Sequence, residues 1–277
     1  MAEGHHRRHL RFAATERAAV GALEDDVHHL RVVLRHDGAR VTAVSGEIVR
    51  LPWTTCAGSV AGLDSLVGTA LADARDLRDA YDAARHCTHF FELAQLTLAQ
   101  AARGPGRRDY RCTIVLPEPA TQTAAETAAE TPAATPAETR AHPPDDAPAL
   151  VHAVITCDGT VVHEWDLRGD IVVSAGPFEG ASLRRGFRDR WLALADDPAE
   201  AALVLRRAVW MSPIRHMHLD DYDSVAATGV SPGSCFTTQP GRIAVAFRNR
   251  GTQQDYDSTP ELLLAGFDEW SQQVLGA

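Results

Sequence analysis

The sequence has no long apolar run. Within its 277 residues, no stretch approaches the ~20 consecutive apolar side chains that a membrane-spanning helix needs. The start of the chain, Met1-Ala-Glu-Gly-His-His-Arg-Arg, has no apolar segment behind it, which argues against a secretory signal. We therefore expect a cytoplasmic protein without a membrane partner.

Cysteine is also scarce. A chain of this length with five cysteines, an odd number, does not fit a disulfide framework. We expect reduced thiols that are free to bind a metal or to take part in chemistry.

Basic side chains are outnumbered, with 27 Lys and Arg against 37 Asp and Glu and a formal net charge of -10. Because phosphate contacts depend on clustered Lys and Arg, this balance argues against a nucleic-acid partner. There is also no Gly-rich phosphate loop, no nucleophile elbow and no His-Glu-x-x-His. A small-molecule substrate is the expected partner, and a homodimer remains open.

Large apolar side chains are nearly absent from residues 117–148, which contain mainly Pro, Ala, Thr and Glu. Such a segment cannot bury enough surface to offset the entropy lost on ordering. It predicts a disordered linker or insertion between a first region, 1–116, and a second region, 149–277.

The first region begins with strand patterns. Residues 9–13 and 18–35 are apolar or alternating, and Asp37-Gly38 followed by an alternating run over 41–49 predicts a hairpin. Helical spacing follows over 57–70, 73–84 and 86–102, and Arg103-Gly104-Pro105-Gly106 ends the last of these. This order predicts an α+β fold in which helices pack on one face of an antiparallel sheet.

The second region predicts a further α+β unit that covers or completes a site of the first. Its patterns indicate strands over 150–175, helices over 182–195 and 198–211, a strand over 242–248 and a helix over 260–274.

Four residues of the first region have the side chains that metals prefer. Asp26 is expected on the first strand, with His28 facing the same side. Cys56 follows the strands, and His86 and Cys87 begin a helix. Carboxylate, thiolate and imidazole together suit zinc or iron. The competing interpretation is that the thiols are small core residues and that the acidic run is a solvated edge.

The order of these motifs over residues 18–102 resembles the IscU/NifU-type iron–sulfur scaffold fold. The resemblance implies an IscU-like antiparallel sheet, with Asp26, Cys56, His86 and Cys87 as the residues that hold zinc or a nascent cluster in that family. It is carried by Glu24-Asp-Asp-Val-His-His-Leu-Arg-Val32, the hairpin, Thr55-Cys56-Ala-Gly-Ser59, Leu66-Val-Gly68 and His86-Cys87.

One departure changes the expected cofactor. Glu24 stands where the scaffold has its first cysteine, which leaves two thiols instead of three. This favours a mononuclear Zn or Fe site over an iron–sulfur cluster. Whether Glu24, His28 or His89 joins the site stays open. His89 is expected to point away from Cys87, as a core histidine or a partner of a ligand.

Pro52-Trp-Thr-Thr-Cys56 together with Cys87-Thr-His89 also resembles an uncharacterised bacterial family of unknown function, which implies no activity. In the second region, His216 and His218 lie in a run rich in Asp and are candidates for acid–base chemistry. A polar loop is the favoured interpretation of that run.

These observations predict a metal-dependent enzyme of the lyase, isomerase or hydrolase type that acts on a small organic substrate. Asp26, His28, His216 and His218 are its candidate catalytic residues. The alternatives are a non-catalytic iron–sulfur or sulfur-carrier scaffold and a cofactor-free acid–base enzyme.

Overall fold

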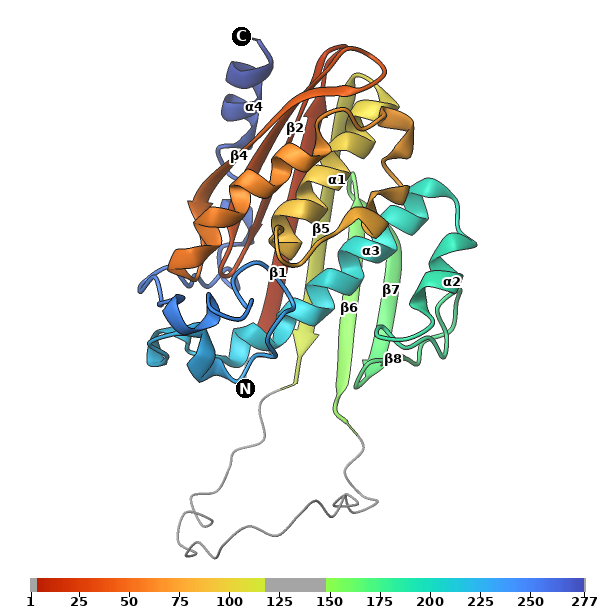
Figure 1. Ribbon diagram of the computed structural model, residues 1–277. Coiled ribbons are helices and arrows are strands. Elements are labelled where there is room, and N and C mark those ends of the chain that lie inside the picture. Colours follow the sequence, from red (N-terminus) through yellow and green to blue (C-terminus); the bar gives the residue numbers. More distant parts are fainter. Residues whose placement is uncertain (1–3, 118–147, 277) are drawn as a thin grey trace, which may run out of the picture.

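The computed structural model describes residues 4–117 and 148–276, and its described strands form one antiparallel sheet (Figure 1). The predicted linker over 117–148 lies almost wholly outside the described residues. The strands are β1 (Gly4–Ala14), β2 (Ala18–Asp25), β3 (His29–His36), β4 (Val41–Arg50), β5 (Gly106–Leu116), β6 (Leu150–Cys157), β7 (Thr160–Arg168) and β8 (Ile171–Val172).

The strand order is β4-β3-β2-β1-β5-β6-β7-β8, which is symmetrical about the central pair. β1 and β5 pair along their whole length, from Gly4 with Leu116 to Ala14 with Gly106. Each half is therefore a four-stranded meander that runs outward from the centre and is followed by a helix. One sheet thus includes strands from both regions that the sequence separates.

The helices cover both faces of the sheet. α1 (Thr88–Arg103) and α3 (Asp196–Met211) lie on one face, with α2 (Phe187–Leu192) beside α3 (Figure 1). α4 (Phe267–Leu275) packs on β1 and β2 through the cluster that holds Val20 and Phe267, separate from the core under α1 and α3. The predicted α+β fold is confirmed. The prediction that all helices pack on one face of the sheet is wrong, because α4 covers the other face. β2 is buried along its length as a result.

One apolar core joins the two halves on the α1–α3 face. It includes Leu10 of β1, Leu93 of α1, Ile155 of β6 and Leu205 of α3. The apolar periodicity of the strands and of the two long helices is what directs these side chains to the same layer.

Several local predictions are confirmed and others are wrong. The hairpin at Asp37-Gly38 joins β3 and β4, with Gly38 at a φ of 100° that favours glycine. The predicted α-helices over 57–70 and 73–84 are instead the 3₁₀ turns η1 (Thr54–Leu66), η2 (Leu71–Asp73) and η3 (Asp76–Ala80). Packing shapes this segment, since a Cβ on Gly62 would lie 2.4 Å from the Arg85 carbonyl oxygen.

The last hundred residues are more irregular than predicted. The strand expected over 242–248 is a turn, η7 (Ile243–Val245), followed by isolated bridges from Phe247 and Arg248 to Ser224 and Trp53. The remaining turns are η4 (Ser212–His216), η5 (Leu219–Asp221), η6 (Val225–Thr228) and η8 (Pro260–Leu262).

Candidate functional site

Asp26 and His28 lie in the turn between β2 and β3, not on one continuous strand as the alternation predicts. Asp25 shapes this turn. Its Oδ1 accepts the backbone N–H groups of Val27 at 3.1 Å and His28 at 2.9 Å, and it lies 3.0 Å from Nδ1 of His28. This Asx-type turn aligns the His28 imidazole with the Asp25 carboxylate.

Arg8 of β1 faces Asp25 across the strand pair and is fully buried. Its guanidinium donates to Asp25 Oδ2 and to Glu92 Oε2 of α1, each at 2.7 Å. Burial alone would raise the pKa of Asp25, but His28 and Arg8 outweigh it and hold that pKa well below its usual range. Asp25 is therefore ionised, and one arginine links two carboxylates.

His89, in the first turn of α1, extends this cluster. Its ring centroid lies 4.0 Å from that of His28. Burial lowers the pKa of His89 well below its usual value, and the charges of His28 and Arg8 act in the same direction, so the ring is neutral. Its Nδ1 lies 3.8 Å from Cys87 Sγ, so it does not point away from that thiol as predicted. Its Nε2 is buried without a hydrogen-bond partner among the described residues.

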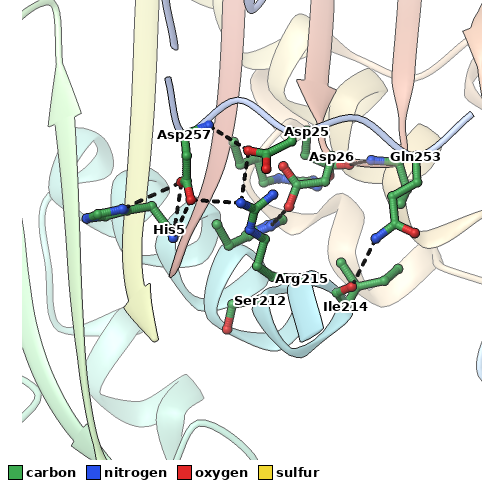
Figure 2. A network of polar contacts seen from close by, with 12 residues as sticks. His5, Asp25, Asp26, Ser212, Ile214, Arg215, Gln253 and Asp257 are labelled. Carbon is green, nitrogen blue, oxygen red and sulfur yellow. Dashed lines mark hydrogen bonds and ion pairs between the residues drawn. The ribbon is translucent and has the colours of Figure 1, made fainter. Parts of the chain in front are cut away.

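Asp26 belongs to a neighbouring network at the same end of the sheet. Its Oδ2 lies 2.9 Å from Nδ1 of His6, and burial raises its pKa. Within the described ranges, Asp26 Oδ1 and His6 Nε2 are buried without a partner. Figure 2 shows Arg215 beside Asp26, with Asp257 bound to Arg215 at 2.7 Å and to the His5 N–H at 3.1 Å.

The predicted thiol ligands gather in one region. Cys56 Sγ accepts a hydrogen bond from the Thr237 hydroxyl at 3.1 Å, and burial raises its pKa to about 12. Burial also raises the pKa of Cys87 to about 11. The Phe236 N–H donates to the His86 carbonyl at 3.0 Å, so the segment that holds Cys235 lies between the Cys56 and Cys87 regions. The fold thus brings the segment 235–237 beside the two predicted thiols.

His86 does not offer a free nitrogen to this region. Its Nδ1 accepts the Asp82 N–H at 3.0 Å, so Nε2 carries the proton and faces the Gly62 carbonyl at 3.1 Å and Ser65 Oγ at 3.0 Å. As the side chains lie, the set Asp26, Cys56, His86 and Cys87 does not fit a metal ion. Over residues 4–117 and 148–276, no group of three or more His, Cys, Asp or Glu is arranged to hold one.

His216 and His218 are exposed, and they lie in and just after η4. The acidic residues that follow are used locally, since Asp220 accepts the Gly251 N–H and Asp223 pairs with Arg250. Leu219 of this segment is buried against Val27 and Trp53. The geometry is that of a polar loop anchored on the end of the sheet.

A cleft of about 880 Å³ runs between α1 and α3 and was not predicted from the sequence. Glu92 lies in its wall with Thr88, Tyr81 and Arg207. The side chain of Glu92 is 14% exposed, and its Oε2 lies 3.7 Å from Arg207 Nε. Its Oε1 makes no hydrogen bond to any described residue. Glu92 therefore connects the buried cluster to the cleft.

Sequence reasoning missed Arg8, Asp25, Glu92 and Arg207. The spacing of His89 and Glu92, which puts both on one face of a helix, was an available signal. The partner on β1 was not, because Arg8 lies 84 residues away from Glu92 along the chain.

The fold and the cleft define an α+β protein with a buried ionic cluster beside a small-molecule-sized cavity. Residues 6–103 match the model of a family described as a protein of unknown function (DUF2889). The match covers less than half of the chain but contains the four clustered residues Arg8, Asp25, His28 and Glu92. No curated protein and no solved structure matches the chain. In the part of the chain that the structure describes, no helix has the length and apolar character needed to cross a membrane.

Proposed function

We propose that the protein is an enzyme that carries out acid–base chemistry on a small organic molecule bound in the cleft between α1 and α3, with Glu92 as the group that takes up and returns the proton. The observation that carries this proposal is the position of Glu92. One carboxylate oxygen is fixed by a buried arginine, and the other has no protein partner among the described residues, on a side chain that lines the cleft.

The surroundings of Glu92 suit this role. Arg8 fixes Oε2 at 2.7 Å, which leaves Oε1 to receive a proton from a bound molecule without first losing another contact. Arg207, 3.7 Å from the same carboxylate, supports negative charge that develops on the substrate.

His28 and Asp25 act behind Glu92 and are positioning residues in this proposal. His28 lies against Asp25, Asp25 holds one side of Arg8, and Arg8 holds Glu92. The interaction of each charged group with its neighbour offsets the cost of burying it.

The proposal is tested with Glu92→Gln, which keeps the size of the side chain and removes its basicity. Wild-type protein is incubated in D₂O with a panel of small organic acids, esters and ketones, and turnover or deuterium uptake is followed by NMR and mass spectrometry. We expect a compound that reacts, with a rate roughly 10²- to 10⁴-fold lower in the variant.

The matched control is Glu47→Gln, which removes an exposed carboxylate of β4 and should leave the rate unchanged. A reacting compound whose rate survives Glu92→Gln would falsify the role of Glu92. The absence of any reaction or exchange across the panel in wild-type protein contradicts the proposed enzyme.

A metal-dependent enzyme with Zn or Fe stays a prediction, and so does the iron–sulfur or sulfur-carrier alternative. The position of the segment 235–237 beside Cys56 and Cys87 favours a site that uses thiol ligands. The hydrogen bonds that occupy both nitrogens of His86 oppose the ligand set that the scaffold resemblance implies. The IscU-like arrangement likewise stays a prediction beyond the α+β fold itself.

A further inference from the structure

The cleft has different charge arrangements at its two ends. At the end formed by the last turn of α1 and the first turn of α3, the charged side chains neutralise one another. Arg103 pairs with Asp197 at 3.0 Å and with Glu200 at 2.9 Å, and Arg75 pairs with Asp196. The charged side chains at this end are therefore paired with one another, and none of these pairs needs a charged ligand.

Arg207 is at the other end. Its side chain is 24% exposed, and only its Nε approaches a carboxylate, Glu92 at 3.7 Å. Its two terminal nitrogens make no hydrogen bond to any residue of 4–117 or 148–276. Because Arg8 is already used by Asp25 and Glu92, and Arg206 donates through Nε to the Leu183 carbonyl, Arg207 is a guanidinium at this end that can take an anion. A guanidinium binds a carboxylate with two parallel hydrogen bonds.

An apolar strip connects the two ends. On α3, Ala199, Leu203 and Arg207 follow one another at a spacing of four residues, so they form one stripe that lines the cleft. On α1, Leu96 and Ala99 lie between Glu92 and Arg103 on the facing stripe. At ~1.5 Å per helical residue, the strip from Arg207 to Ala199 is about 12 Å long.

From this arrangement we infer that the cleft binds a monocarboxylic acid with an unbranched aliphatic chain, its carboxylate on Arg207 and its chain along the α1–α3 strip. This inference rests on the proposed function and names its substrate class. With the carboxylate on Arg207, the first carbon atoms of the chain lie beside Glu92, which can exchange a proton with an oxygen-bearing group carried there.

The inference is tested by isothermal titration calorimetry on the full chain, with decanoate as the probe at concentrations below its micelle formation. Decanol has the same chain without the charge, and acetate has the charge without the chain. We expect one decanoate per chain, bound roughly 10- to 100-fold more tightly than decanol, because hydrogen bonds to a charged group contribute more than neutral ones. Acetate should bind more weakly than decanoate as well.

Two variants, with one control, test the contact of the carboxylate and the contact of the aliphatic chain separately. Arg207→Gln should reduce decanoate affinity to that of decanol and leave decanol unchanged, whereas Arg184→Gln removes an exposed arginine outside the cleft lining and should change neither. Ala99→Phe fills the strip and should weaken both long-chain probes. No decanoate binding, equal binding of decanol, or full decanoate affinity in Arg207→Gln overturns the inference.

The outcome is distinguishable from failure of the proposed function. Glu92→Gln should keep most decanoate binding while it loses turnover, because Glu92 is not the anion-binding group. If decanoate does not bind but another compound reacts in a Glu92-dependent way, the substrate class is wrong and the acid–base enzyme stands.

Discussion

Arg8 shows how a single buried side chain organises a site. A guanidinium withdrawn from water is unfavourable unless its charge and its donors are matched. Asp25 and Glu92 supply two short charge-assisted bonds from different elements, β2 and α1. The guanidinium is planar and its N–H groups point in fixed directions, so its hydrogen bond determines where the Glu92 carboxylate lies.

Glu24, the neighbour of Asp25, carries a prediction about pH. Burial alone would raise its pKa, but hydrogen bonds from His29, the Tyr256 hydroxyl and the Leu264 N–H outweigh it and lower the pKa from 4.5 to about 2. Its contribution to the free energy of unfolding is therefore fully present above pH 4.5 and is lost as the pH falls toward 2. Glu24→Gln should lower the free energy of unfolding at neutral pH. In acid, the difference in free energy of unfolding between the variant and the wild type should become smaller.

Urea unfolding at a series of pH values from neutral to acid measures this difference directly. Glu47→Gln, at an exposed site on β4, should follow the wild-type curve at every pH. A constant difference between Glu24→Gln and wild type across the acid range contradicts the assigned pKa.

At the scale of elements, the packing of α1 on β2 depends on a glycine. A Cβ on Gly21 would lie 2.2 Å from Thr97 Oγ1 of α1 and 2.9 Å from the Phe12 ring of β1. The Thr97 and Phe12 side chains thus fill the space that a side chain at position 21 would need. Thr97 lies on the same helix as His89 and Glu92, so a shift of α1 at this contact would move both.

Gly21→Ala should therefore destabilise the fold by about 1–3 kcal/mol, because overpacking in a dense core forces side chains or backbone to move. Gly4→Ala, where the nearest atom to a Cβ is 3.9 Å away, should cost far less. Chemical denaturation of both variants gives the comparison. Equal stability of the two would mean that α1 can shift without cost.

At the scale of the whole molecule, the two halves repeat one arrangement around the β1/β5 pair. Glu92 and Glu200 are each the fifth residue of their helix and reach the central strands, Glu92 to Arg8 of β1 and Glu200 to the Tyr110 hydroxyl of β5 at 2.8 Å. The same position therefore meets an arginine in one half and a phenol in the other. Only the first half continues into the buried His and Asp cluster.

The pairing of β5 with β6 leads to a prediction about residues 118–147. Val115 pairs with His152, so the ends that this segment joins already lie side by side. Replacing 118–147 by a short Gly-Ser turn should leave the fold intact and the free energy of unfolding equal or slightly higher, since a shorter loop loses less entropy on closure. Far-UV circular dichroism and thermal unfolding provide the measurement, and a variant that fails to fold contradicts it.

The sequence by itself determined most strands, the hairpin at Asp37-Gly38 and the two long helices, because periodicity and turn residues act locally. It did not locate the turn at Asp26 to His28, since apolar alternation continues through Val27. It also could not show that the Gly62 carbonyl and the Asp82 N–H occupy both nitrogens of His86.

Only the tertiary structure decided the site. Arg8, Glu92 and Arg207 belong to β1, α1 and α3. No local sequence pattern predicts that these three elements pack against one another. Their encounter depends on the order of strands in the sheet and on two helices lying across the same face. The physical reason is that charge pairing acts over a few ångströms in space, whatever the separation along the chain.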